Sequence, residues 1–245
     1  MSNLNQFKHS PALLPIFLSL LLLLAGNVSA QSTIFGTPST DILPEGKVGI
    51  RFIARFKLND QEAKKKFTQF TPRVIFGVKR NVEIGVNLLG NTQPGQDATT
   101  IVGSVKWRFY ANEKRKTALV VGNNLYIPLR NKKYNLGNYF YVAGSKVLSG
   151  TNTKLTIGSY YFTKNVVARN AARAGGQFGL EQPINQRVTF AAEWLTGRHS
   201  SGNLTTGFKV KVNKRAVASL GYTIANDRAI QGNHFFYTSL AINLN

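Results

Sequence analysis

The sequence predicts an all-β protein, a transmembrane antiparallel up-and-down β-barrel of about twelve strands. Three observations support this prediction. Apolar residues recur at every second position along most of the chain, most of the alternating segments run about nine to twelve residues, and short and long connections strictly alternate. A strand that crosses a bilayer at a tilt needs about nine to eleven residues, whereas strands of soluble proteins usually have about five or six. Segment length therefore favours a membrane barrel over a soluble sandwich.

Residues 1–30 are predicted to be a cleaved signal peptide. They place the cation Lys8 before an apolar run, 12–25, and end in the small residues Val28-Ser29-Ala30. The alternative is an uncleaved membrane anchor, but this run is shorter than the roughly twenty residues that a spanning helix needs. Cleavage would leave residues 31–46 as a periplasmic lead-in or a plug, followed by a barrel over 47–245.

The charge of the chain is strongly basic. It has 31 Lys and Arg against 10 Asp and Glu, and a net charge of +21. Such a balance usually indicates nucleic acid or an anionic surface as partner. The export signal argues against nucleic acid, and the cations alternate with apolar residues instead of forming a tail. The chain has no cysteine, which excludes disulfides and thiol chemistry.

The segment 47–58 shows the alternation most clearly. Val48, Ile50 and Phe52 share one face, while Arg51 and Arg55 share the other. The first face is apolar and can contact lipid, whereas the second carries charges that hydrocarbon does not solvate. The pattern is weakest in 139–147 and 153–162, where aromatic residues fall on both faces. The twelve predicted strands are 47–58, 72–79, 82–88, 99–110, 117–129, 139–147, 153–162, 174–182, 188–196, 204–212, 216–224 and 234–245.

The connections between these strands differ in length by position. The short ones are 80–81, 111–116, 148–152, 183–187 and 213–215, and the long ones are 59–71, 89–98, 130–138, 163–173, 197–203 and 225–233. Outer-membrane barrels have short periplasmic turns and longer outside loops. An unpaired strand edge is too costly in hydrocarbon, so the last strand should pair with the first, antiparallel.

Together the signal, the alternating strands and the loop asymmetry resemble a Gram-negative outer-membrane β-barrel. More loosely, "TPRVIFGVKRNVEIGVNL" (71–88) and "GNHFFYTSLAINLN" (232–245) look like transporter-type barrels labelled as phenol-degradation (meta-pathway) proteins. The resemblance implies a bacterial outer-membrane location, small-molecule uptake, and outer-membrane lipid, lipopolysaccharide and the barrel-assembly machinery as partners. Members of this group commonly end on an aromatic residue, whereas this chain ends Leu244-Asn245.

The inward-facing charges are the candidate functional residues, because Lys or Arg facing mid-bilayer lipid would cost about 2–4 kcal/mol each. A lumen lined by cations attracts anions, so the sequence predicts a channel or transporter for small polar or anionic solutes. The alternative is that these charges brace the wall or bind lipopolysaccharide phosphates at the rim. The predicted pore-lining residues are Arg51, Arg55, Lys57, Arg73, Lys106, Arg108, Lys209, Lys211, Glu83, Glu181 and Glu193.

One stretch raises an enzymatic alternative. "GRHSSGN" (197–203) carries His199, Ser201 and Asn203, and some outer-membrane lipid hydrolases use a similar His-x-Ser-Asn motif. Here Gly202 intervenes before the asparagine, and a polar stretch of Ser, Gly and Asn is more typical of a turn. A structural or adhesive barrel with a blocked pore is a third possibility. The sequence predicts no metal site and no cofactor, because ligand spacing is absent.

Overall fold

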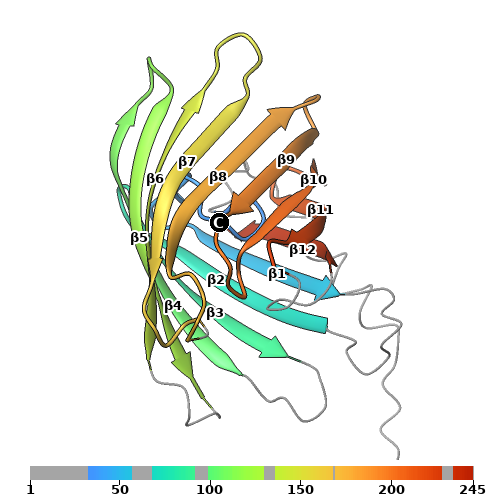
Figure 1. The fold of residues 1–245 in the computed structure, drawn as a ribbon. Helices are drawn as coiled ribbons and strands as arrows, with labels where there is room; N and C mark the ends of the chain where they lie inside the picture. The colour runs from blue at the N-terminus through green and yellow to red at the C-terminus, as the bar shows by residue number, and fades with distance from the viewer. Residues whose placement is uncertain are drawn as a thin grey trace, which may run out of the picture.

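Twelve β-strands form the wall of the protein (Figure 1). The computed structural model describes residues 33–56, 68–91, 99–129, 136–167, 169–227 and 234–244. Within these ranges, no helix has the length and apolar character needed to cross a membrane. The strands are β1 (Val48–Phe56), β2 (Thr68–Lys79), β3 (Val82–Asn91), β4 (Thr100–Asn112), β5 (Thr117–Pro128), β6 (Gly137–Val147), β7 (Lys154–Phe162), β8 (Ala174–Pro183), β9 (Val188–Leu195), β10 (Asn203–Lys211), β11 (Ala216–Ala225) and β12 (Phe235–Leu244).

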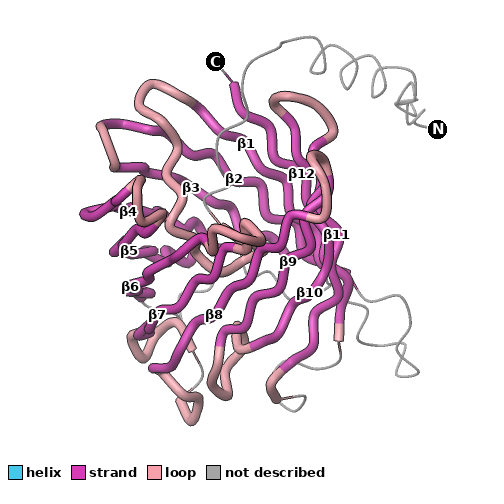
Figure 2. The backbone as a smooth tube through the Cα atoms, turned by 90° about the horizontal axis from the view of Figure 1, so that it is seen from above, coloured by secondary structure: helices cyan, strands magenta, loops and turns pink. Residues whose placement is uncertain are grey.

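The sheet closes on itself. Each strand pairs antiparallel with the next along the chain, and β12 pairs with β1 from Val48 opposite Leu244 to Phe56 opposite Phe236. Viewed from above, the strands follow one another around the wall, and β1 lies beside β12 (Figure 2). Closure removes the two exposed edges that an open sheet would have. The predicted fold class and the predicted antiparallel closing pair are therefore confirmed.

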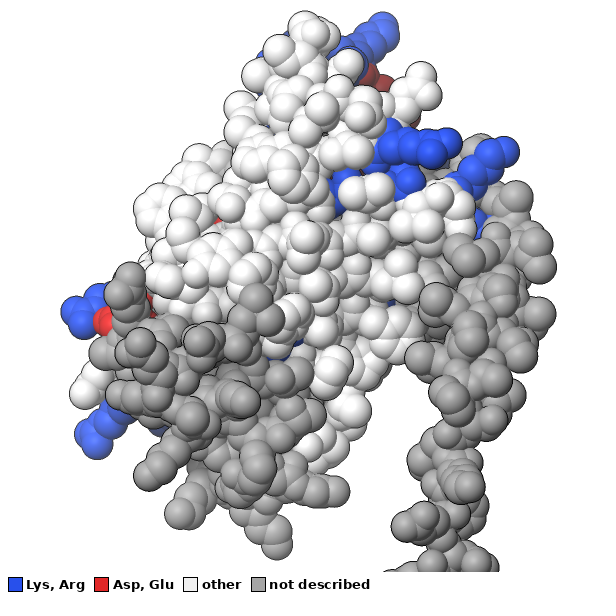
Figure 3. Space-filling model, turned by 90° about the vertical axis from the view of Figure 1, so that its right-hand side faces the viewer, with Lys and Arg blue, Asp and Glu red and all other residues white. Residues whose placement is uncertain are grey.

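The two faces of the wall differ as the alternation predicts. Phe52 is 54% exposed on the outside, whereas its neighbour Arg51 is 4% exposed on the inside. The exposed large apolar residues come from strands around the whole wall, among them Trp107, Ile157 and Leu220. In one side view uncharged residues cover a broad area, and Lys and Arg are confined to its margins (Figure 3). The outer face is thus suited to hydrocarbon, while polar groups turn inward.

The structure settles the register of β6 and β7. Tyr139 and Tyr141 point inward and are buried, while Phe140 and Val142 are exposed on the outer face. Both faces of these strands are therefore aromatic or aliphatic, which is why the alternation in the sequence is weak there.

Three of the short turns contain a residue in the left-handed region. Asn81, Lys116 and Asn152 have φ values of 71°, 50° and 54°, and each lies in one of the short connections. Asparagine adopts this conformation more readily than most residues, which explains two of the three positions.

Candidate functional site in the lumen

Residues 33–46, here called the inner segment, lie inside the ring of strands (Figure 1). The segment begins with a tight turn in which Thr33 bridges to Pro38 and the Ile34 amide donates to the Thr37 carbonyl at 2.9 Å. Ile34 and Phe35 are completely buried. They pack with Ala191 and Tyr237 from the wall in a small apolar cluster.

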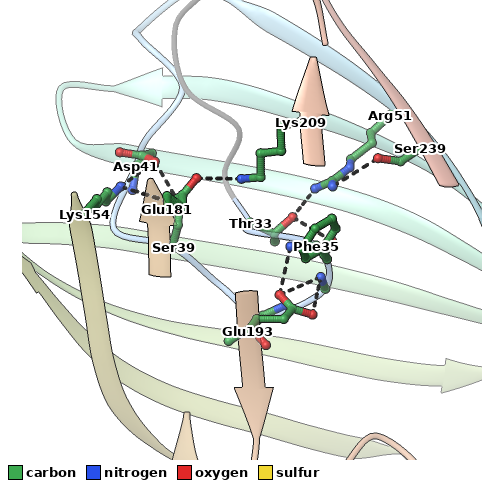
Figure 4. Close-up of polar contacts among 12 residues, drawn as sticks. Thr33, Phe35, Ser39, Asp41, Arg51, Lys154, Glu181, Glu193, Lys209 and Ser239 are labelled. Carbon is green, nitrogen blue, oxygen red and sulfur yellow. Dashed lines mark hydrogen bonds and ion pairs between the residues drawn. The ribbon is translucent and has the colours of Figure 1, made fainter. Parts of the chain in front are cut away.

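Glu193 of β9 anchors this turn. Its carboxylate accepts the backbone N–H groups of Phe35 at 2.8 Å, Gly36 at 2.9 and 3.0 Å, and Thr37 at 2.8 Å (Figure 4). Successive backbone amides that converge on one anion form a favourable anion-binding concavity. Glu193 was predicted to face the lumen, but no pattern in the sequence indicated that its partner would be the backbone of residues 35–37.

The far end of the inner segment contacts the opposite side of the wall. Lys106 of β4 donates to the carbonyls of Ser39 and Asp41, and it pairs with Glu83 of β3 at 3.2 Å. The other oxygen of Glu83 accepts the Leu43 amide at 3.0 Å. Both side chains of this pair are about 3% exposed, so each charge depends on these contacts to offset its loss of hydration.

A second charged group crosses from the inner segment to the β7–β10 side (Figure 4). Asp41 pairs with Lys154 at 2.6 Å, Lys154 lies 4.0 Å from Glu181, and Glu181 pairs with Lys209 at 2.6 Å. Burial is the largest single influence on Asp41 and opposes its ionisation, but the ammonium groups of Lys154, Lys106 and Lys209 together outweigh it and hold the pKa of that carboxyl below its usual value. Acids and bases therefore alternate from the inner segment to β10.

Glycines on the wall make room for the inner segment. A Cβ at Gly77 of β2 would lie 2.0 Å from the Pro44 carbonyl oxygen, and one at Gly179 of β8 would lie 2.1 Å from Ile34 Cδ1. The first approach leaves no room for a side chain at Gly77, because the oxygen belongs to the backbone, whereas the second would require the Ile34 side chain to turn away. By contrast, a Cβ at Gly103 of β4 would meet nothing within 4 Å. The wall is thus shaped to receive this segment.

The arginines of β1 and β2 form a basic patch on the inner face. Arg51 and Arg73 are direct register partners, and Arg55 follows Arg51 on the same face. Arg51 donates to the hydroxyls of Thr33, Tyr237 and Ser239. We call Arg51, Arg55 and Arg73 the arginine patch.

An aromatic patch covers the inner face of β6 and β7. The rings of Tyr139 and Phe162 stack at 4.7 Å, and Tyr160 meets Phe162 edge-on at 5.2 Å. Tyr139 donates to Gln177 Oε1 at 3.0 Å, and Tyr160 donates to the Thr196 carbonyl. The buried members of this patch are Val120, Tyr139, Tyr141, Ala143, Tyr160, Phe162, Val167 and Leu195.

Two of the remaining predicted pore-lining residues lie toward the ends of strands. Arg108 of β4 donates to Asn81 Oδ1 at 2.8 and 3.2 Å, in the short turn between β2 and β3. Lys211 is the last residue of β10, where it is exposed. Lys57 lies outside the described residues. The pore-lining role of the whole set stays a prediction.

Sequence reasoning missed Asp41, Lys154 and Arg215 among the buried or half-buried luminal charges. Lys154 lies opposite Glu181 in the β7–β8 register, so a correct register for β7 would have found it. Asp41 and Arg215 lie outside the strands, where alternation carries no information.

The arrangement around His199 does not form the catalytic His–Ser pair that the hydrolase alternative requires. His199 is fully buried, and its Nδ1 accepts the backbone N–H of Ser201 at 3.2 Å. Its Nε2 lies 2.7 Å from the Tyr160 hydroxyl and 2.9 Å from the Thr196 carbonyl. Burial lowers the pKa of His199, against the hydrogen bond to Thr196, which raises it. Both ring nitrogens are thus engaged by other groups, whereas a catalytic serine needs one of them as its base.

The part of the chain that the structure describes contains no cluster of three or more metal-ligating side chains of His, Cys, Asp or Glu.

Comparisons with known proteins show a similarity of fold but no similarity of sequence to a known family or curated protein. No protein-family model and no curated protein matches the chain. The fold is similar to that of the KdgM porin solved in complex with disordered oligogalacturonate, with a TM-score of 0.59, 7% identity, and coverage of 81% of this chain and 99% of that chain. At this identity the likeness shows a fold shared with an outer-membrane porin.

Two further structures score lower. An outer-membrane channel from Pseudomonas putida F1 has a TM-score of 0.46 and 11% identity over 83% of this chain and 97% of that one. Outer membrane phospholipase A from Escherichia coli has a TM-score of 0.48 and 12% identity over 81% of this chain and 92% of that one. We draw no conclusion from either.

Proposed function

We propose that this protein is an outer-membrane channel or transporter for small polar or anionic solutes, exported by the signal peptide at residues 1–30. The observation that carries the proposal is the excess of cations on the inner face. Arg51, Arg55 and Arg73 lie together on β1 and β2. A low-dielectric wall focuses their field into the lumen, which raises the local concentration of anions and repels cations.

The inner segment is the plug of this channel, and the described arrangement is its closed state. The segment contacts strands on opposite sides of the lumen through Glu193, Lys106 and Lys154. Hydrogen bonds and ion pairs hold the segment to the wall, and water can replace them when it leaves. Ile34, Phe35 and Leu43 are also buried, so leaving the lumen costs the exposure of these apolar side chains and favours the closed state.

Two further observations support uptake of small molecules. The fold is shared with a porin, and the stretches 71–88 and 232–245 resemble transporter-type barrels. The barrel-assembly machinery, outer-membrane lipid and lipopolysaccharide are the partners that this location requires.

Planar-bilayer conductance of the refolded protein in a salt gradient tests the proposal. The chain 31–245 should conduct little or in rare openings. A chain that also lacks residues 31–42 should conduct steadily, with a reversal potential on the anion-selective side. A cation-selective reversal potential, or no current from either chain, would contradict the channel.

The hydrolase alternative is tested in the same preparation. Lipid hydrolysis by the wild-type chain that disappears in Ser201→Ala would replace the channel proposal with an enzymatic one. We expect no hydrolysis from either protein.

A further inference from the structure

The register of β1 and β2 brings two arginines face to face. Arg51 lies directly opposite Arg73, and both point inward. Residues directly opposite on one face have Cβ atoms about 4.5–5.5 Å apart, and like charges in such a pair destabilise the sheet. Arg55 adds a third cation two inward positions further along β1, beyond Ile53. This repulsion lowers the stability of the barrel, and a function for the three arginines would explain why they lie so close together.

None of the three forms an ion pair within the described residues. Arg51 donates only to the uncharged hydroxyls of Thr33, Tyr237 and Ser239. Arg55 has a long contact to Gln69 Oε1 at 3.4 Å and lies over the rings of Phe235 and Tyr237, with 5.8 and 5.9 Å to the ring centroids. The Nε atoms of Arg51, Arg55 and Arg73 are all buried without a hydrogen-bond partner.

The luminal acids are engaged elsewhere. Glu83 binds Lys106 and the Leu43 amide, and Glu181 binds Lys209. Glu193 holds the backbone of residues 35–37, and Asp41 binds Lys154. Among the described residues, no carboxylate thus lies within ion-pair distance of the arginine patch.

Two carboxylates lie near the patch without forming an ion pair with it: Glu83 acts electrostatically on Arg73, and Glu193 Oε1 borders Gly36, as Arg55 Nη2 does. The other groups around the patch are hydroxyls, an amide and aromatic rings. Arg55 and Arg73 act electrostatically on the hydroxyl of Tyr126, and Arg73 acts on that of Tyr141. Asn87 lies opposite Arg73 in the β2–β3 register. The rings of Phe235 and Tyr237 flank Arg55. The patch therefore combines guanidinium and hydroxyl donors with apolar ring surface.

We infer that the arginine patch is a binding site for the carboxylate of a small organic solute. A guanidinium presents its donors as a planar fork that matches the two oxygens of a carboxylate. In the described arrangement Ile34 and Phe35 of the inner segment cover the ring of Tyr237. Once that segment withdraws, the neighbouring rings provide surface for an apolar body, which chloride and inorganic phosphate lack. The inference deepens the proposed function, on which it rests, because the solute would reach the patch through the channel.

Calorimetric titration of the refolded chain 31–245 in detergent tests the site, with butyrate as the probe at constant ionic strength. We expect saturable binding of butyrate. Arg73→Gln should weaken it about tenfold or more, because a hydrogen bond to a charged group contributes about 1.5–3 kcal/mol. Arg55→Gln is a second variant with the same expected direction, and Arg73→Lys should also weaken binding because it keeps the charge and loses the fork.

Arg187→Gln is the matched control, since it removes one exposed cation from the turn between β8 and β9. Its affinity for butyrate should equal that of the wild type. Heat-modifiable migration in detergent gels checks that each variant has folded.

The site and the channel can fail separately. Anion-selective current without saturable butyrate binding would overturn the carboxylate site and leave the channel standing. An equal loss of affinity in Arg73→Gln and Arg187→Gln would mean that only the net charge matters and would overturn the site. Tighter binding of inorganic phosphate than of butyrate would overturn the ligand class. Butyrate binding in a barrel that conducts no anions would instead overturn the proposed channel.

Discussion

The aromatic patch and the arginine patch lie on different parts of one inner wall and are stabilised in opposite ways. On β6 and β7, Tyr139, Tyr160 and Phe162 pack on one another and place their hydroxyls on fixed acceptors. On β1 and β2, Arg51 and Arg73 face each other without an ion pair in the described chain, and their Nε atoms have no hydrogen-bond partner. The aromatic patch is stabilised by contacts among its own residues. The arginine patch takes one of its hydrogen bonds from the inner segment, and it is where we propose that a solute carboxylate binds.

The largest expected effect of this difference between the two patches is on the free energy of unfolding. Phe162→Ala removes a fully buried ring that stacks on Tyr139, and should lower the free energy of unfolding by about 3–5 kcal/mol. Phe140→Ala, on the exposed face of the neighbouring strand, is the control and should cost much less. Urea unfolding of the refolded barrel in lipid vesicles measures both. Equal losses in the two variants would mean that the aromatic patch is not a core.

The next effect concerns the space reserved for the inner segment. Gly77→Val places its Cβ on the Pro44 carbonyl oxygen, so the segment should shift at a cost of about 1–3 kcal/mol. The anion current of the chain 31–245 should rise as the plug loosens. Gly103→Val is the matched control, because a Cβ there meets nothing within 4 Å and current should stay as in the wild type. An unchanged current in Gly77→Val would argue against a plug.

A smaller effect follows from the anchor of the turn. Glu193→Gln replaces a charged acceptor of the residue 35–37 amides by a neutral one, which should weaken docking by about 1–2 kcal/mol. Limited proteolysis of the inner segment should become faster, while the unfolding transition of the barrel stays in place. Glu113→Gln, in an exposed turn, serves as the control. Protection that is the same in all three proteins would remove Glu193 as the anchor.

The smallest effect is a pH dependence. Because Lys154 holds the pKa of Asp41 below its usual value, the charged form stabilises docking above that usual value, near 4. This contribution is lost as the pH falls through the lowered pKa. Asp41 is about a third exposed, so solvent screening limits it to about 1 kcal/mol or less. Channel opening should rise in acid in the wild type, and this rise should shrink in Asp41→Asn. A rise of the same size in both would assign it to another group.

The closed barrel could be predicted because each of its features has a local signal. Hydrocarbon outside and polar groups inside impose an alternation that shows in Val48, Arg51 and Phe52 without any knowledge of their neighbours. The strand bounds follow from where that alternation stops. It weakens at 139–147, where the inner face is itself aromatic, because burial among rings leaves the same signal as lipid.

The candidate site was predictable only as a set of inward charges. Parity identified Arg51, Glu83 and Glu193 as inward-facing, and their burial agrees with it. Parity could not separate Lys211, exposed at the end of β10, from Lys209, which is buried and paired with Glu181. Depth along the barrel depends on how neighbouring strands are staggered, and one strand does not contain that information.

The sequence by itself determined which face of each strand meets lipid, because that choice depends on every second residue of a single strand. Only the tertiary structure decided which inward charges meet. Glu193 and residues 35–37 are more than 150 positions apart, as are Arg51 and Tyr237, yet each pair is joined by hydrogen bonds across the closed ring. Charges interact strongly only over a few ångströms. Closing the barrel and seating the inner segment bring most of the luminal acids next to hydrogen-bond or ion-pair partners, while the Nε atoms of the arginine patch have no hydrogen-bond partner.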